Sequence, residues 1–197
     1  MTIKQNPGLV DGLRFRVSHP KLSEPMPSDE ELATAYQAAF RAPDHAWLRP
    51  WRFIECRHDE RERLGEMFVE GLLADGTSLP EHKLEKIRKG PLRAPLVIVC
   101  YARIIDHVKV PRLEQEIATG CAANNLVSAL YGLGYAAVWR SGHPAFSSGV
   151  RQRLNLDESS QIVGMLYVGS PVGDVKKVPE LERADFVTTL SEQVDLT

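Results

Sequence analysis

Residues 111–134 read PRLEQEIATGCAANNLVSALYGLG, and this stretch constrains how the rest of the chain is arranged. Pro111 suits the first position of a helix, and Gly132 and Gly134 suit its end. Between them, apolar and small residues point in nearly every direction, which is typical of a helix surrounded by protein. Small residues such as Gly120 let another backbone approach closely. That backbone belongs either to the same chain or to a second copy.

Short apolar segments on both sides of this helix predict strands. Residues 94–102, APLVIVCYA, are continuously apolar and β-branched, which is typical of a central strand buried on both faces. Residues 135–139 and 161–169 predict two more strands, separated by a loop that leads into a short helix. Residues 51–56 alternate in polarity and predict a further strand.

Helical periodicity is clearest near the start of the chain. Ser28 and Glu31 have the spacing of a capping box, and an apolar stripe follows them as far as Phe40. A second stripe runs over residues 64–76, and residues 81–90 suit a short polar helix. Helices and strands therefore mix without strict βα alternation, which indicates an α+β fold.

Length and composition are those of one soluble globular domain. The chain has 197 residues, of which 43% are hydrophobic and 25% charged, and this length can bury a continuous core. The formal net charge of -2 provides no overall field to attract nucleic acid or an anionic membrane. No stretch approaches a membrane span, and the first residues lack an apolar run of signal-peptide length. We therefore expect a soluble cytoplasmic protein.

Residue types that carry common chemistry are absent as motifs or scattered. The sequence contains no GxGxxG, GxxxxGKS/T, GxSxG or HExxH, which argues against the usual dinucleotide, nucleotide, hydrolase and zinc-protease devices. Its 3 cysteines show no CxxC spacing and its 6 histidines are dispersed. We therefore expect reduced thiols and no metal site.

Three polar clusters remain, and each joins arginine to a hydrogen-bonding partner and to a residue that restricts the backbone. They are residues 14–20 (RFRVSHP), 41–51 (RAPDHAWLRPW) and 139–144 (WRSGHP), all expected in loops or at strand ends. Arg16 with Ser18 suits a phosphate or a carboxylate. The third cluster follows a strand directly, so its loop can present backbone N–H groups to a ligand. The alternative for each cluster is an arginine that caps a helix and faces water.

Several stretches carry a resemblance to a known family. RVS followed by PKLSEP, RAPDH followed by RPWRF, KVPRLEQEIATGCA, GLGYAAVWRSG and IVGMLYVGSP resemble the FMN-dependent nitroreductases, in particular their YdjA-like bacterial branch. The resemblance implies a central, mostly antiparallel sheet flanked by helices, in a homodimer with FMN at the interface. We expect residues 1–13 to be an N-terminal extension and residues 14–197 to be a single domain with an extended C-terminal segment.

The resemblance also implies roles for the first two clusters. Arg16, Val17 and Ser18 would hold the FMN phosphate and ribityl chain of one subunit. A planar guanidinium and a compact hydroxyl both suit a phosphate dianion. Arg41 and His45 would reach the same flavin from the partner subunit.

The third cluster would line the flavin ring. The resemblance places Trp139, Arg140 and Ser141 along the isoalloxazine, with backbone N–H groups near Ser141 and Gly142 facing flavin N5. No catalytic side chain is expected, because the cofactor carries the electron chemistry. Glu114, in the first turn of the long helix, is expected to serve the helix dipole rather than to act as an acid or base.

The implied activity is that of an FMN-dependent NAD(P)H oxidoreductase. Hydride would pass from NAD(P)H through flavin N5 to a nitroaromatic, quinone or similar acceptor, with ping-pong kinetics. Two alternatives remain open. One is a different flavin chemistry on the same scaffold, such as reductive dehalogenation or flavin degradation. The other is a module that holds or delivers FMN without turnover.

Overall fold

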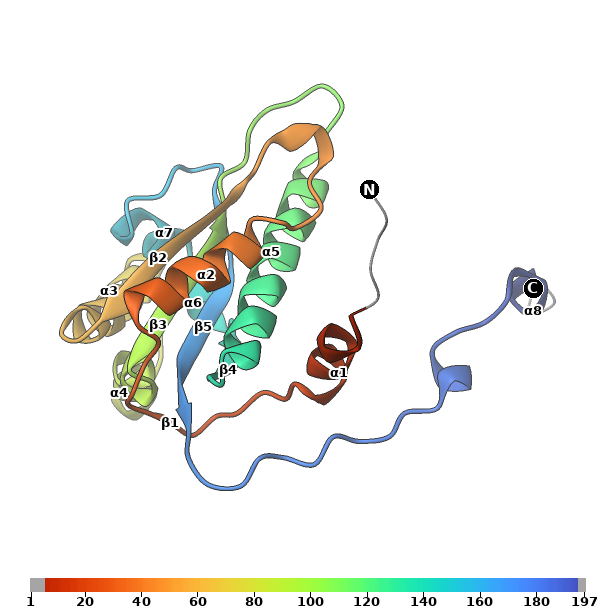
Figure 1. The fold of residues 1–197 in the computed structure, drawn as a ribbon. Helices are drawn as coiled ribbons and strands as arrows, with labels where there is room; N and C mark the ends of the chain where they lie inside the picture. Colours follow the sequence, from red (N-terminus) through yellow and green to blue (C-terminus); the bar gives the residue numbers. More distant parts are fainter. Residues whose placement is uncertain (1–5, 195–197) are drawn as a thin grey trace.

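The computed structural model describes residues 6–194, and its central feature is a sheet. In that range, five strands pair in the order β1 (Leu22–Ser23), β5 (Gln161–Pro171), β3 (Leu96–Ala102) and β2 (Trp51–Arg57), while β4 (Ala136–Arg140) also pairs with β5. These pairings are all antiparallel, and helices cover both faces of the sheet (Figure 1). The prediction of an α+β fold with a mostly antiparallel sheet is confirmed.

The helices form two layers around this sheet. Over residues 6–194 they are α1 (Pro7–Phe15), α2 (Asp29–Ala39), α3 (Glu60–Ala74), α4 (Glu81–Arg88), α5 (Arg112–Gly132), α6 (His143–Phe146), α7 (Ser148–Arg153) and α8 (Leu190–Val194), with 3₁₀ turns η1 (His45–Trp47), η2 (Gly90–Arg93) and η3 (Arg183–Asp185). Helices α2 and α5 pack on one face of the sheet, and α3, α6 and α7 pack on the other. None of the helices within this range is long and apolar enough to cross a membrane.

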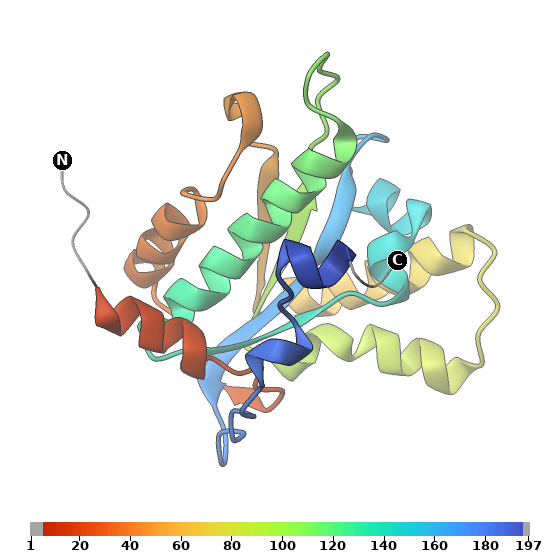
Figure 2. The same cartoon turned by 90° about the vertical axis from the view of Figure 1, so that its right-hand side faces the viewer.

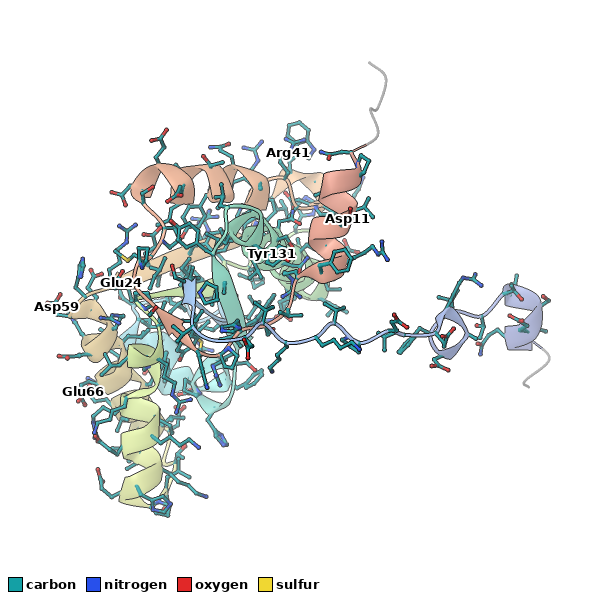
Figure 3. The ribbon with its side chains drawn as sticks, turned by 60° about the horizontal axis from the view of Figure 1, so that its bottom comes forward. Asp11, Glu24, Arg41, Asp59, Glu66 and Tyr131 are labelled. Carbon is teal, nitrogen blue, oxygen red and sulfur yellow. The ribbon has the colours of Figure 1, made fainter. Side chains whose placement is uncertain are left out.

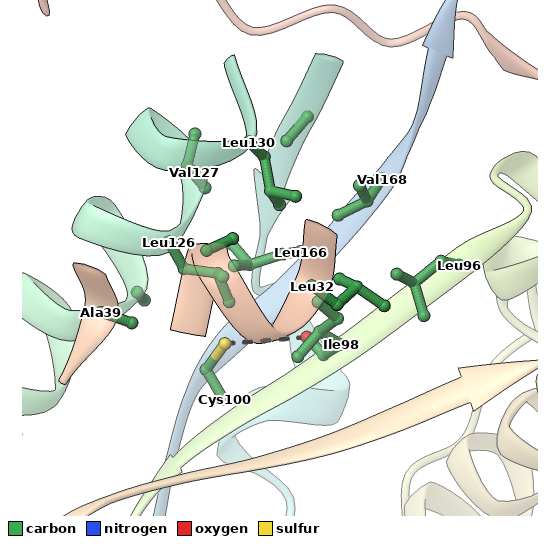
Figure 4. Close-up of a cluster of buried hydrophobic side chains, with 13 residues drawn as sticks. Leu32, Ala39, Leu96, Ile98, Cys100, Leu126, Val127, Leu130, Leu166 and Val168 are labelled. Carbon is green, nitrogen blue, oxygen red and sulfur yellow. Dashed lines mark hydrogen bonds between the residues drawn. The ribbon is translucent and has the colours of Figure 1, made fainter. Parts of the chain in front are cut away.

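Strand β3 lies between the two helix layers. Its residues from Leu96 to Cys100 are all 0% exposed. Because side chains alternate across a strand, Ile98 and Cys100 pack under α2 and α5, whereas Val97 and Val99 pack under α3. Figure 4 shows the first of these clusters. The prediction of a strand buried on both faces is confirmed.

The predicted capping box sets the start of α2. The Ser28 hydroxyl accepts the Glu31 backbone N–H at 3.3 Å, and the Glu31 carboxylate accepts the Ser28 N–H at 2.9 Å. The same carboxylate also accepts the hydroxyls of Ser28 and Tyr135, each at 2.8 Å. These bonds, led by the one from the Ser28 backbone, hold the pKa of Glu31 below its usual value. The helix then buries Leu32 and Ala39 against the sheet.

Helix α5 is covered by its own chain on one side only. Its buried residues form a stripe against the sheet, and they are Gln115, Ala118, Thr119, Ala122, Ala123, Leu126, Val127 and Leu130. On the side away from the sheet, Leu113 is 64% exposed and Ile117 is 55% exposed. Figure 2 looks onto this side of the helix. We call it the outer face of α5.

The two terminal segments bury nothing. None of residues 7–15 in α1 is buried, and residues 172–194, here called the C-terminal arm, are exposed apart from the half-buried Val178. Apolar side chains on both are open to solvent, including Phe15 at 49%, Phe186 at 69% and Leu190 at 81%. Both segments project from the side of the molecule where α5 lies, and the side chains of the arm extend away from the body (Figures 1 and 3).

Helix α1 differs from the loop expected around residue 14. Asn6 caps it by accepting the Leu9 N–H at 3.2 Å, and Pro7 occupies the first turn. Arg14 and Phe15 therefore lie in its last turn, and the first polar cluster leaves the helix only at Arg16.

Candidate functional site

The first and third polar clusters lie side by side. The backbone N–H of His19 donates to the Ala137 carbonyl at 3.2 Å, and its ring Nε2 lies 3.1 Å from the Val172 carbonyl. A carbonyl only accepts, so Nε2 carries the hydrogen. His19 is 4% exposed. This buried residue holds the end of the first cluster beside β4, two residues before the third cluster begins at Trp139.

A bulge in β5 orients Trp139. A shift in the pairing of β3 with β5 leaves Val163 as the extra residue, and Trp139 Nε1 donates to its carbonyl at 3.2 Å. A Cβ at Gly164 would lie 1.9 Å from that same nitrogen, so glycine is needed to make room for the indole. The ring lies toward α5, where a Cβ on Gly120 would be 3.9 Å from it. Trp139 keeps 38% of its surface exposed.

Arg140 points to the opposite face of the sheet, as alternation along a strand requires. Its guanidinium carbon lies 5.6 Å from the centre of the Tyr167 ring, and its Nε is buried without a hydrogen-bond partner among the residues described. Burial raises the pKa of Tyr167, although the charges of Arg140 and Arg93 oppose this. Ser141 is exposed, and Gly142 turns the chain with a φ of 75°. A buried donor without a partner is costly, which makes Arg140 a candidate ligand contact.

The second polar cluster forms a constrained loop. Three of its residues have a backbone in the left-handed region, with φ of 57° at Ala46, 57° at Trp47 and 47° at Arg49. This conformation is costly for residues other than glycine. The Asp44 carboxylate accepts the N–H of Arg49, five residues further on, at 2.7 Å. Trp47 is 79% exposed, and the Arg49 guanidinium lies 5.5 Å from its ring centre.

His45 contacts α5 in the same chain. Its Nδ1 lies 2.7 Å from a carboxylate oxygen of Glu114 in the first turn of that helix. From the sequence, Glu114 was expected only to interact favourably with the dipole of α5. The two residues are 69 positions apart, so no local pattern could have joined them. Arg41, at the other end of the loop, is exposed.

Two cavities adjoin these clusters. The larger, of about 950 Å³, lies between the end of α2, the second cluster and β2, and its lining includes Tyr36, Phe40, Arg41, Trp47 and Trp51. Burial, followed by the negative charge of Glu55, raises the pKa of Tyr36. The smaller, of about 420 Å³, lies beside Gly142 and is lined by Leu72, Asp75, Thr77, His143, Phe146 and Ser147.

Helix α5 separates the two halves of the predicted site. Gly120, beside Trp139, follows Glu114, beside His45, by six residues. At 3.6 residues per turn these positions are about 120° apart around the helix. The outer face, with Ile117, lies between them (Figure 2). One chain thus brings the first and third clusters together and keeps the second on another flank.

Thiol and metal chemistry find little support here. Burial raises the pKa of Cys56 to about 11 and also raises the pKa of Cys100, so both stay protonated and poorly nucleophilic at neutral pH. Residues 6–194 contain no group of three or more His, Cys, Asp or Glu side chains placed to hold a metal ion. The donors at the end of β4 and in residues 16–18 instead suit an organic anion.

Comparison with known sequences agrees with the motifs. The model of the "Nitroreductase family" matches residues 13–170. The "Putative NAD(P)H nitroreductase YdjA" of Escherichia coli strain K12 is 38% identical over 156 residues, which is 79% of this chain and 84% of that protein.

Solved structures share the fold. A nitroreductase-like family protein from Bacillus cereus superposes with a TM-score of 0.72 at 22% identity, covering 98% of this chain and 96% of the other. A mutant of the FMN and NADPH-dependent nitroreductase NfnB from Sphigopyxis sp. strain HMH gives 0.73 at 14% identity, covering 92% and 98%. Sequence motifs, family model and fold thus agree, and the chain belongs to the nitroreductase family.

Proposed function

We propose that the protein is an FMN-dependent NAD(P)H oxidoreductase that works as a homodimer. The observation that carries this proposal is the division of the site by α5. Donor groups lie on one flank of the helix, and the loop with Arg41 and His45 lies on another. A second copy packed on the outer face would place the loop of one subunit near the β4 end of the other.

The donor set at the end of β4 fits FMN. Arg16 and Ser18 suit the phosphate by charge and by hydroxyl donation. Arg140 leaves β4 on the opposite face of the sheet from Trp139, so it would meet the flavin beyond the end of the strand, where its buried Nε has no partner in the described chain. The indole of Trp139 is fixed by Val163 and provides a rigid wall. When bound, FMN would supply the hydride chemistry between NAD(P)H and a second substrate such as a nitroaromatic or a quinone.

Exposed apolar surface supports the homodimer. Leu113 and Ile117 on the outer face of α5 are more than half exposed in the single chain. Leu9 on α1 and Phe186 on the arm are also exposed, at 60% and 69%, and the two segments that carry them lie on the side of α5 (Figure 1). Large apolar patches on one side of a soluble protein mark interaction surfaces.

The relatives support the nucleotide and the cofactor. NfnB is described as FMN and NADPH-dependent, and YdjA is named for NAD(P)H. NfnB shares the fold of this chain at a TM-score of 0.73, and YdjA shares 38% of its residues over 156 positions. Two substrates that use one cavity in turn give ping-pong kinetics, the expected kinetic pattern here.

Anaerobic reduction tests the proposal. Purified protein is saturated with FMN, unbound flavin is removed, and NADPH or NADH is added without air. We expect the visible flavin absorption to bleach with at least one nucleotide and to return when a quinone or nitroaromatic is added. Colour that persists with both nucleotides contradicts a reductase and favours a protein that only holds FMN. A colourless protein that does not take up FMN contradicts both functions.

A further inference from the structure

His45 and Glu114 form a contact whose chemistry fixes the imidazole ring. The distance from His45 Nδ1 to the Glu114 carboxylate is 2.7 Å. An ionised carboxylate only accepts hydrogen bonds, so Nδ1 carries the hydrogen. In the neutral ring Nε2 is then a lone-pair acceptor, and in the protonated ring Nε2 is a donor. In either form Nε2 is the nitrogen left for another molecule.

Both residues of the pair are anchored by their surroundings. Asp44 holds the Arg49 N–H, which closes the loop around His45. At the start of α5, Arg112 donates to the Ser159 carbonyl at 2.9 Å, which ties this end of the helix to another segment. The contact therefore joins two backbones that other bonds hold in place, while the side chains themselves are about half exposed, at 53% for His45 and 47% for Glu114.

We infer that Glu114 is a positioning residue for His45, which it holds with hydrogen on Nδ1 and with Nε2 directed to the cofactor. This inference rests on the proposed function, in which His45 reaches the flavin bound by a second copy. A carboxylate behind a histidine selects the tautomer and orients the ring, as it does behind metal-binding histidines.

A dipole role makes a different prediction. If Glu114 served only the start of α5, Glu116 would serve it in a similar way, because it lies two residues further along the same end of the helix. Glu116 pairs with Arg112 instead of His45. The substitution Glu116→Gln therefore removes the same charge from the same helix end without touching His45, which makes it a matched control for Glu114→Gln.

The first measurement needs no cofactor. In FMN-free protein labelled with ¹⁵N-histidine, two-bond proton–nitrogen spectra report which ring nitrogen of His45 carries hydrogen, with His45→Asn to assign the signal. We expect hydrogen on Nδ1 in the wild type and in Glu116→Gln, and a mixture of tautomers in Glu114→Gln. A wild-type ring with hydrogen on Nε2 alone would overturn the inference.

The second measurement is FMN affinity, followed by the quenching of flavin fluorescence. We expect Glu114→Gln to weaken binding about fivefold to tenfold, as for the loss of one hydrogen bond, and Glu116→Gln to change it less than about twofold. In a His45→Asn background Glu114→Gln should have no further effect. Equal losses in the two glutamine variants would overturn the inference. Wild-type protein that does not bind FMN would contradict the proposed function. The tautomer of His45 would still show whether Glu114 positions its ring.

Discussion

The two sides of α5 have similar residues and different surroundings. On the inner side, Ala122, Leu126 and Leu130 are 0% exposed. On the outer side, Leu113 and Ile117 are as apolar but remain 64% and 55% exposed. A single chain therefore buries the apolar side chains of the inner side only. The inner residues of α5 stabilise the fold, and its exposed outer residues are the contact that we propose for a second copy.

The largest expected effect lies on the inner side. Leu126→Ala should lower the free energy of unfolding by about 2–5 kcal/mol, because it leaves a cavity in a closely packed cluster. Urea unfolding followed by circular dichroism measures this. Leu73→Ala on α3, where the side chain is 51% exposed, is the control and should cost less than about 1 kcal/mol. Similar losses in the two variants would remove the distinction.

The next effect tests the outer side. Ile117→Asp should weaken self-association about a hundredfold, since a charge would be buried at an apolar contact. Sedimentation over a range of protein concentrations measures the association. Leu73→Asp, on the opposite layer of the sheet, should leave it unchanged. An Ile117→Asp protein that associates like the wild type would show that the outer face is not the contact.

A smaller effect is expected at the proposed contact between Arg16 and the FMN phosphate. Arg16→Ala should weaken FMN binding about tenfold to a hundredfold, because a charge-assisted hydrogen bond to phosphate is lost. Equilibrium dialysis measures the affinity. Arg153→Ala removes a guanidinium that pairs with Glu70 in the other helix layer, and it should have no effect. Unchanged affinity in Arg16→Ala would place the phosphate elsewhere.

The smallest effect concerns an intrachain contact under acid. Hydrogen bonds from Ser147, from Ser148 and from the Gly149 N–H lower the pKa of Asp75. A group whose pKa is lower in the folded state stabilises it at neutral pH, and this contribution is lost as pH falls below about 4. Asp75→Asn should therefore flatten the acid limb of a stability curve. This change should not depend on protein concentration, unlike effects on the outer face. An acid limb as steep as that of the wild type would contradict the assignment.

Local signals predicted the elements that build the fold. The spacing of Ser28 and Glu31 predicted the start of α2, and the apolar run ending at Ala102 predicted β3. Both patterns depend on residues near one another in the sequence, so a single chain reveals them. Pro111 likewise predicted the start of α5 to within one residue.

Contacts between distant residues were not predictable in this way. The pair of His45 and Glu114 depends on how the loop folds back on α5. The bulge at Val163 depends on how β3 pairs with β5. Its only trace in the sequence is the glycine that follows it, Gly164. The placement of the first and third clusters was proposed through the family resemblance, and their ligand contacts remain predictions.

The left-handed loop has a consequence for the kinetics of recognition. Ala46, Trp47 and Arg49 are held in a conformation that a free chain rarely visits. The surrounding bonds keep this shape before any molecule arrives, so little conformational entropy is lost on encounter. The strained backbone lowers the free energy of unfolding, whereas a loop that already has its final shape would meet a partner without a slow rearrangement.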